Sequence, residues 1–384
     1  MRYNDFNGEK VSSLGFGTMR LPMDANGNID YAEGEKMVAK AFEGGITYFD
    51  TAYKYHQGES ENFCGKALSK YPRESFTLAD KLPTWLCKSV EDAQRIFEEQ
   101  LEKCKVSYFD YYLLHSIDEE SWVGIEELDL VSFMVKLKEE GRVKHIGFSA
   151  HCEPELLDTI LSKYGHILEF VQLQINYFDW EFLKAKALYD VARKYNKPII
   201  IMEPIRGGML ANLPSKETRD ILEKATKDSG KEPVSYASYA LRFVEQLDGV
   251  VCTLSGMSDS SQMEDNIKTF SGDQLSETEL AAIPIAASKL QADILVPCTA
   301  CDYCFECPSQ IKIPKIFAWY NEAAAKDFHW IWGSLTKTYE KLGPNATDCV
   351  ECGNCEGLCP QKIGVIQKLK DIHKKYEELK ELGE

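Results

Sequence analysis

Eight short runs rich in β-branched and aromatic residues alternate with eight amphipathic stretches along residues 11–270, and this alternation constrains the fold most strongly. The β-rich runs are at 11–19, 46–49, 76–79, 111–114, 145–148, 170–173, 199–202 and 250–254. The stretches with helical spacing are at 31–42, 61–69, 90–103, 130–140, 154–163, 181–194, 234–244 and 262–268. Because parallel strands need a crossover between them, the alternation predicts either a closed (β/α)8 barrel or a doubly wound open sheet. No Gly-x-Gly-x-x-Gly turn follows an early strand, which favours the barrel.

The chain is too long to be a barrel alone. Its 384 residues exceed the about 250 residues that are typical of such a barrel. A passage rich in Ser, Gly, Asp and Glu follows Phe270, and a segment with helical character comes next. We therefore predict an α/β chain with a TIM barrel at 1–275, a linker helix at 276–297 and a small, mainly helical domain at 298–384.

Two dense cysteine runs lie in the predicted C-terminal domain. Eight of the 13 cysteines fall within 298–307 and 349–359, and each run ends in Cys-Pro. The second run has the Cys-x-x-Cys-x-x-Cys-x-x-x-Cys-Pro spacing of bacterial ferredoxins, in which three thiolates from one run and a fourth from the other hold each cubane iron–sulfur cluster. The resemblance implies two 4Fe-4S clusters, one held by Cys298, Cys301, Cys304 and Cys359 and the other by Cys349, Cys352, Cys355 and Cys307.

A pair of structural zinc sites is the alternative for these thiols, because four thiolates also bind zinc in a tetrahedron. Zinc sites usually keep two Cys-x-x-Cys pairs well apart, whereas here four cysteines crowd into about a dozen residues. One departure from the ferredoxin pattern is that only two residues separate Cys304 from Cys307. The spacing favours iron–sulfur clusters.

Composition points to a reducing compartment and argues against two partner classes. Cysteines that hold a cluster must stay reduced, which requires a reducing compartment. The other five cysteines are scattered along the chain, and we interpret them as buried apolar residues: Cys64, Cys87, Cys104, Cys152 and Cys252. No signal peptide or membrane span is visible, so we expect a cytoplasmic protein that does not bind membranes. The formal net charge of -17 argues against nucleic acid, since phosphate binding needs clustered Lys and Arg.

Polar side chains follow the second, third and fourth predicted strands. Asp50 and Tyr55 come after the second, Lys81 after the third, and His115 ends the fourth. Each alone has an ordinary explanation, as a helix cap, a solvated cation or a core histidine. Chemistry in a barrel sits at the carboxyl ends of the strands, so the set as a whole indicates an active site.

With these residues the sequence resembles the aldo-keto reductase family over about residues 9–270. The resemblance rests on Phe-Asp50-Thr-Ala with Tyr55 three residues later, Gly58-x-Ser60-Glu61, Lys81 and Leu-Leu-His115. It implies Tyr55 as acid/base, Lys81 as the cation that lowers the Tyr55 pKa, Asp50 as the partner of Lys81, and His115 as the donor that orients the carbonyl oxygen. The cysteine runs resemble the branch of that family with a C-terminal ferredoxin-like domain.

The resemblance also implies positions for a nicotinamide cofactor, either NADP or NAD. Ser149 and Gln174 would hold the nicotinamide, and Met202 stands where many members stack a Tyr. The pyrophosphate and ribose would lie against Pro204, Arg206, Gly207, Gly208, Ser255, Gly256, Met257, Gln262, Asp265 and Asn266. Gly256 and Gln262 replace the Lys and Arg that grip the 2′-phosphate in many members, which weakens the case for NADP.

Three functions are compatible with the sequence. The first is a reductase that converts a small-molecule carbonyl substrate to an alcohol with NAD(P)H, its clusters serving electron transfer or structure and a ferredoxin or flavoprotein acting as electron partner. The second is a one-electron reductase driven by the clusters without nicotinamide. The third is a non-enzymatic redox-sensing or binding protein that uses the barrel as a scaffold.

Overall fold

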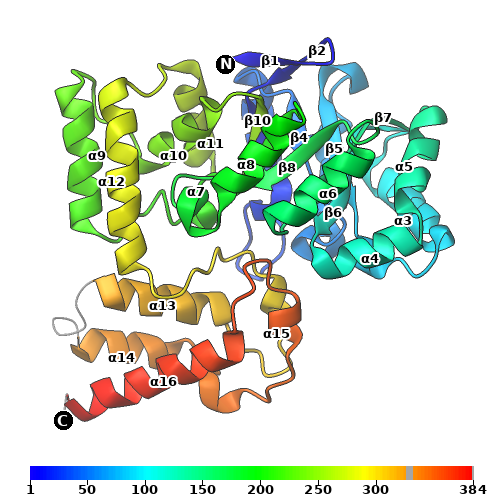
Figure 1. Cartoon of the computed structure of the whole chain (residues 1–384). Helices are drawn as coiled ribbons and strands as arrows, with labels where there is room; N and C mark the ends of the chain where they lie inside the picture. The colour runs from blue at the N-terminus through cyan, green and yellow to red at the C-terminus, as the bar shows by residue number, and fades with distance from the viewer. Residues whose placement is uncertain (326–331, 383–384) are drawn as a thin grey trace. The chain divides into compact units, whose positions relative to one another are not determined.

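The computed structural model of the chain describes residues 1–325 and 332–382 and divides into two compact units (Figure 1). The first unit comprises Met1–Ile205 and Ala237–Leu275, and the second comprises Arg206–Tyr236 and Ser276–Glu384. No helix among the described residues is long and apolar enough to span a lipid bilayer.

The first unit is a closed, all-parallel barrel of eight strands in the order β10-β3-β4-β5-β6-β7-β8-β9, which confirms the predicted fold class. Each predicted strand is present, with ends that differ by a few residues. The barrel strands are β3 Leu14–Gly17, β4 Tyr48–Asp50, β5 Thr77–Leu82, β6 Phe109–Ile117, β7 Val143–Ala150, β8 Phe170–Gln174, β9 Ile199–Met202 and β10 Val250–Ser255.

Helices follow the strands and cover the outside of the barrel (Figure 1). Serine or aspartate caps several of them at the N-terminus, as Asp30, Ser89 and Asp259 do for the first, third and last helices of the unit. The helices of this unit are α1 Tyr31–Glu43, α2 Glu59–Leu68, α3 Val90–Cys104, α4 Glu119–Glu127, α5 Leu130–Glu139, α6 Pro154–Tyr164, α7 Asp179–Phe182, α8 Ala185–Lys194, α10 Tyr236–Glu245 and α11 Ser260–Ser271.

A hairpin of β1 Tyr3–Phe6 and β2 Glu9–Ser12 precedes the barrel and was missed in the sequence. Phe6 of this hairpin is buried, and its ring centre lies 5.1 Å from that of Tyr111 and 5.9 Å from that of Phe170. Tyr111 and Phe170 lie near the amino ends of their strands. The hairpin therefore closes the end of the barrel opposite to the predicted active site.

The second unit is mainly helical. Its helices are α9 Lys216–Asp228, α12 Glu277–Asp293, α13 Ile313–Ala325, α14 Trp332–Lys341, α15 Asn354–Gly357 and α16 Val365–Leu382. Glu279 joins two of them, because its carboxylate accepts hydrogen bonds from Thr226 and Lys231 at the end of α9. Residues 206–236 thus pack in the second unit although they fall inside the segment 1–275, and the domain boundaries remain a prediction.

Candidate active site and cysteine cavities

An ion pair lies at the centre of the predicted active site. The Lys81 ammonium is 2.6 Å from Asp50 Oδ1 and donates a second hydrogen bond, 2.7 Å long, to the carbonyl oxygen of Thr51. Lys81 is fully buried and Asp50 nearly so. Burial raises the pKa of Asp50, and the charge of Lys81 opposes that rise. Parallel pairing of β4 with β5 places the two side chains on the same inner face at the same end.

Tyr55 lies directly after β4, in a short 3-10 helix at Tyr55–Gly58. His56 and Gln57, which follow it, have left-handed backbone angles (φ 50° and 58°). The Lys81 ammonium lies 5.0 Å from the centre of the ring. Burial raises the pKa of Tyr55 well above its usual value, and the charge of Asp50 adds to the rise. Burial outweighs the opposing charge of Arg20, so the phenol is protonated. That Lys81 lowers this pKa stays a prediction.

Tyr53 has a different environment, although it is only two residues away. Its hydroxyl donates a 2.8 Å hydrogen bond to Glu99 on α3, and the Lys103 ammonium lies 4.2 Å from its ring centre. Tyr53 thus packs on the helical layer outside the barrel. Only Tyr55 of the two tyrosines is near Lys81.

His115 completes the set from β6. Its ring is buried, and the ring centres of His115 and Tyr55 are 6.2 Å apart in an edge-on arrangement. Burial, followed by the charges of Lys81 and His151, lowers the pKa of His115 well below its usual value, so the imidazole is neutral. Within the described part of the chain, His115 Nδ1 has no hydrogen-bond partner. The structure brings all four predicted catalytic side chains together.

Trp85 is a neighbour of this group that the sequence did not single out. It lies in the short 3-10 helix Thr84–Leu86 after β5, with 44% of its surface exposed. Its ring centre is 5.2 Å from that of His115. The position is four residues after Lys81, so the signal available in the sequence was its place at a strand end. A half-exposed aromatic ring beside a buried histidine can form a wall for a substrate.

The predicted nicotinamide contacts lie on β7, β8 and β9. Ser149 Oγ accepts a hydrogen bond of 2.7 Å from the backbone N–H of Ser116. Gln174 donates a 2.8 Å hydrogen bond to Asp179. Gln172 lies two residues earlier, on the same face of β8. Its side-chain amide donates a hydrogen bond of 3.6 Å to Met202 Sδ, and its Oε1 has no hydrogen-bond partner among the described residues. Sequence reasoning did not select Gln172. Its carbonyl oxygen is buried and unpartnered among the described residues, so it can accept a hydrogen bond from an amide group that reaches it.

The predicted pyrophosphate and ribose contacts fall into both units. Pro204 follows β9 in the first unit. Ser255 ends β10 in the same unit, Gly256 and Met257 follow it, and Gln262, Asp265 and Asn266 lie on α11. Arg206, Gly207 and Gly208 form a short 3-10 helix in the second unit, and both glycines have positive φ angles (63° and 94°). The Asn266 side chain donates a 2.8 Å hydrogen bond to Ser255 and so joins α11 to β10.

An aspartate occupies the N-terminus of α11. Asp259 accepts hydrogen bonds from the backbone N–H groups of Ser261 (2.9 Å) and Gln262 (3.0 Å), and from the Gln262 side chain (2.8 Å). The Ser261 hydroxyl also donates to Asp259, and this side-chain hydrogen bond contributes most to lowering the pKa of Asp259, so the carboxylate is ionised. Arg20 lies beside the preceding loop, where a Cβ at Gly256 would be 3.2 Å from its side chain. The loop therefore combines a negative charge at the helix with a nearby cation.

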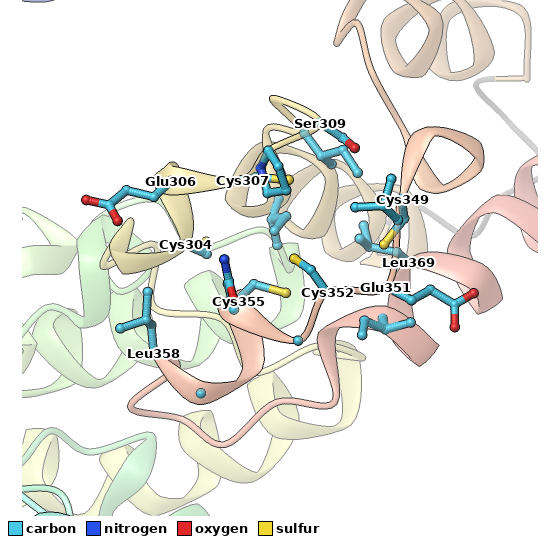
Figure 2. Close-up of a pocket in the computed structure, with 18 residues that line it drawn as sticks. Cys304, Glu306, Cys307, Ser309, Cys349, Glu351, Cys352, Cys355, Leu358 and Leu369 are labelled. Carbon is cyan, nitrogen blue, oxygen red and sulfur yellow. The ribbon is translucent and has the colours of Figure 1, made fainter.

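The eight clustered cysteines line two cavities of the second unit. The larger cavity has a volume of about 310 Å³, and Figure 2 shows Cys307, Cys349, Cys352 and Cys355 around it. Cys298, Cys301, Cys304 and Cys359 line the smaller one. Cys304 and Cys355 belong to the walls of both cavities.

The donor set of these cavities fits iron–sulfur clusters. Each cavity contains the four thiols that the crossing of the two runs predicts, beside apolar residues such as Ile313. The N–H of Ala300 donates to Cys298 Sγ at 3.3 Å, a contact that suits a thiolate ligand. Among the described residues, no group of three or more His, Cys, Asp or Glu side chains has the geometry that would hold a single metal ion. Thiols around a cavity suit a cubane better than one tetrahedral zinc ion. The five other cysteines are buried, as expected.

Comparisons with known proteins agree with both units. A profile of the aldo/keto reductase family matches residues 13–287, and a profile of a 4Fe-4S dicluster domain matches residues 297–364. The chain is 30% identical over 305 residues to probable aldo-keto reductase 1 of Glycine max, covering 72% of this chain and 85% of the relative. It is 26% identical over 285 residues to L-galactose dehydrogenase of Arabidopsis thaliana, covering 68% and 84% of the two chains.

A solved structure supports the same relationship. The crystal structure of the thermostable aldo-keto reductase Tm1743 in complex with the inhibitor epalrestat superposes with a TM-score of 0.62 at 25% sequence identity. The match covers 74% of this chain and the whole of that one (100%).

Proposed function

Because the chain belongs to the aldo/keto reductase family, we propose that it reduces the carbonyl group of a small molecule to an alcohol with a nicotinamide cofactor as hydride donor. The observation that carries the proposal is the buried group of Asp50, Lys81, Tyr55 and His115, in which a protonated phenol lies over a lysine–aspartate pair. A bound nicotinamide would supply a hydride ion to the carbonyl carbon.

Tyr55 supplies the proton that this reaction needs. As the carbonyl carbon gains hydride, negative charge develops on its oxygen, and a protonated phenol beside it donates the proton that completes the alcohol. The raised pKa keeps Tyr55 protonated before the reaction. The phenolate that forms is stabilised by Lys81, whose ammonium is 5.0 Å from the ring centre. Asp50 holds that ammonium in place with a 2.6 Å hydrogen bond.

His115 orients the substrate. A neutral imidazole carries one N–H donor and one acceptor nitrogen, and the low pKa keeps His115 in this form. It can therefore donate a hydrogen bond to the carbonyl oxygen without bringing a second positive charge close to Lys81. Together Tyr55 and His115 define where the oxygen binds, and Trp85 forms a wall beside it.

The loop at α11 favours NADH over NADPH. In family members that use NADPH, a cation stands at the position of Gln262 and grips the 2′-phosphate. Here the Gln262 amide is bonded to the ionised carboxylate of Asp259, which would repel that phosphate. The aliphatic part of Arg20 lies beside Gly256, and its guanidinium is 3.8 Å from Glu203, so a pyrophosphate at this loop would share that cation with a carboxylate.

The second unit binds two 4Fe-4S clusters in this proposal, with ligands partitioned between the two cavities as described. The clusters would take up and release single electrons. Since the ligands need a reducing environment, we place the protein in the cytoplasm, where a ferredoxin or flavoprotein could serve as electron partner.

One observation favours a second candidate, a cluster-driven reductase without nicotinamide. Met202 stands where many members stack a Tyr on the nicotinamide, and its sulfur is in contact with Gln172. Met offers no flat face to a nicotinamide ring. In this candidate Tyr55 and His115 keep their roles as proton donor and orienting residue.

Anaerobic titration and turnover distinguish the two candidates. We expect binding of NADH and turnover of a panel of aldehydes and ketones in both the cluster-loaded and the cluster-free protein, with a higher kcat/KM for NADH than for NADPH. The Asp259→Ser variant keeps a helix cap and should narrow that difference. Turnover that requires dithionite-reduced clusters and is unaffected by NADH would support the second candidate.

A further inference from the structure

Arg206 is a fully buried cation in the second unit. Only 1% of its surface is exposed. Its guanidinium donates a 2.9 Å hydrogen bond to the carbonyl oxygen of Pro297 and a 3.4 Å hydrogen bond to that of Cys298. Cys298 is the first cysteine of the first run. The guanidinium therefore lies against the main chain of a predicted cluster ligand.

A neutral side chain holds the same segment from another direction. Asn321 on α13 accepts hydrogen bonds from the N–H groups of Leu295 (3.0 Å) and Val296 (2.9 Å), and it donates one of 2.7 Å to the carbonyl oxygen of Val296. Residues 295–298 are thus clamped by an asparagine and an arginine. The neutral amide of Asn321 is enough to hold residues 295 and 296 in place. At residues 297 and 298 the chain uses the charged guanidinium of Arg206 instead.

Burying a guanidinium costs free energy unless hydrogen bonds and an opposite charge compensate it. An anionic iron–sulfur cluster held by Cys298 would supply such an opposite charge. Electrostatic interactions are stronger in a buried site than at the surface, because the local dielectric constant is low. A positive charge near an iron–sulfur cluster favours the reduced form, which carries one more negative charge, and the reduction potential of such clusters responds to charge and hydrogen bonding around them. Arg206 is placed to act in this way on the cluster that Cys298 ligates.

We propose that Arg206 is a positioning residue whose charge raises the reduction potential of the cluster held by Cys298, Cys301, Cys304 and Cys359. The inference rests on the proposed function only in requiring that this cluster is present. The step concerned is the uptake of one electron by the cluster from an added reductant, with no bond made or broken and no proton transferred. Sequence reasoning also assigned this guanidinium to a cofactor pyrophosphate, but it is buried against the carbonyl oxygens of Pro297 and Cys298, so that contact stays a prediction.

The test is an anaerobic redox titration of the full-length, cluster-loaded protein with dithionite, followed by low-temperature electron paramagnetic resonance. Arg206→Gln removes the charge and keeps a hydrogen-bond donor, Arg206→Lys keeps the charge, and Asn321→Ala loosens the same segment without changing charge. We expect two reduction waves in the wild-type protein. One of them should move to lower potential in Arg206→Gln and stay in place in Arg206→Lys and Asn321→Ala.

The Asn321→Asp variant makes the test independent of whether Arg206→Gln assembles its clusters. An aspartate can still accept the N–H groups of Leu295 and Val296, but it adds a negative charge to the segment. The same wave should move to lower potential in Asn321→Asp. Unchanged potentials in the cluster-loaded Arg206→Gln protein, or in Asn321→Asp if Arg206→Gln binds no cluster, would overturn the inference. A wild-type protein that binds no iron would instead contradict the cluster part of the proposed function.

Discussion

Lys81 and Asp50 form an ion pair with 2.6 Å between Nζ and Oδ1, and their side chains are 0% and 3% exposed. Removing one partner of such a pair leaves an uncompensated charge, which typically costs about 3–5 kcal/mol. Because apolar residues of similar volume are often at least as stable in such a place, the ion pair is poorly explained by stability alone. The pair fixes a positive charge next to the Tyr55 phenol.

Lys81→Met should abolish most of the activity. Without the ammonium the Tyr55 phenolate is no longer stabilised, and we expect kcat to fall by about 100-fold or more, the usual range for loss of acid–base assistance. Steady-state kinetics with a small aldehyde and NADH checks this. Lys103→Met is the matched control, since Lys103 also pairs with a carboxylate, Glu61, at 2.9 Å. Because Lys103 lies beside Tyr53, its loss should leave kcat within a few-fold of wild type.

His115 should stay neutral throughout the working pH range. Its pKa is lowered, so protonation occurs only well below the usual value and the orienting N–H is unchanged as the pH rises from 6 to 8. We expect no inflection of kcat/KM near pH 6.5 in the wild-type enzyme. His115→Phe should reduce kcat/KM at every pH in this range. An inflection near pH 6.5 that disappears in His115→Phe would show that the imidazole titrates there.

Gln172 and Gln174 should differ in what they contribute. The buried side-chain carbonyl oxygen of Gln172 has no hydrogen-bond partner among the described residues, whereas the Gln174 side chain donates a 2.8 Å hydrogen bond to Asp179. Gln172→Ala is expected to raise the Kd for NADH about tenfold with little loss of stability. Gln174→Ala is expected to lower the unfolding free energy by about 1 kcal/mol and to change the Kd less. Fluorescence titration and urea unfolding measure both quantities, and the opposite pattern would restore Gln174 as the nicotinamide contact.

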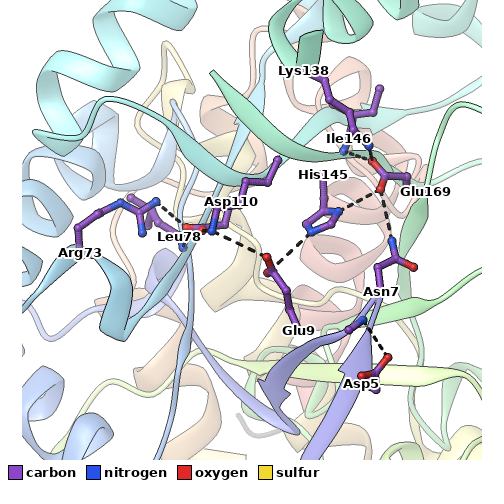
Figure 3. Close-up of polar contacts among 12 residues, drawn as sticks. Asp5, Asn7, Glu9, Arg73, Leu78, Asp110, Lys138, His145, Ile146 and Glu169 are labelled. Atoms are coloured by element: carbon purple, nitrogen blue, oxygen red, sulfur yellow. Dashed lines mark hydrogen bonds and ion pairs between the residues drawn. The ribbon is translucent and has the colours of Figure 1, made fainter. Parts of the chain in front are cut away.

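Glu169 should make the barrel sensitive to acid. Burial opposes ionisation, but hydrogen bonds from His145 (3.0 Å) and Lys138 (2.6 Å), drawn in Figure 3, and from the Ile146 N–H lower the pKa of Glu169 to about 2. A folded-state pKa below the unfolded value gives stability that is fully present above about pH 4.5 and is lost as the pH falls towards 2. The shift corresponds to about 3 kcal/mol.

Unfolding by urea at several pH values tests this expectation. The stability difference between wild type and Glu169→Gln should be largest at pH 6–7 and shrink between pH 4.5 and 3. Both proteins carry the same cysteine runs, so acid loss of clusters affects them equally. A difference that does not depend on pH would show that the Glu169 carboxylate contributes by packing alone.

The barrel could be predicted, and so could the grouping of Asp50, Tyr55, Lys81 and His115, because both depend on local sequence patterns. Each strand is short, β-rich and followed by a helix, and Asp50, Lys81 and His115 each stand at the end of one of them. The hairpin that seals the barrel could not be foreseen, because the contacts of Phe6 with Tyr111 and Phe170 exist only after closure.

A pKa shift, the hydrogen-bond partner of a side chain and the packing of distant helices depend on three-dimensional surroundings, so these properties could not be predicted from the sequence. The direction of the Tyr55 pKa shift follows from burial, which outweighs the opposing charge of Arg20. The choice between Gln172 and Gln174 depends on Asp179, which binds only the second of them. The packing of α9 with α12 depends on Glu279, which lies about fifty residues from its partners in the chain.

The most direct measurement of the central claim compares two tyrosine variants. Tyr55→Phe and Tyr53→Phe each remove one hydroxyl, two residues apart, but only the first lies over Lys81. Single-turnover reduction of an aldehyde by NADH, in protein with clusters loaded, should slow by at least about 100-fold in Tyr55→Phe and remain near wild type in Tyr53→Phe. Equal rates for wild type and Tyr55→Phe, with loss of activity in Tyr53→Phe, would contradict the account.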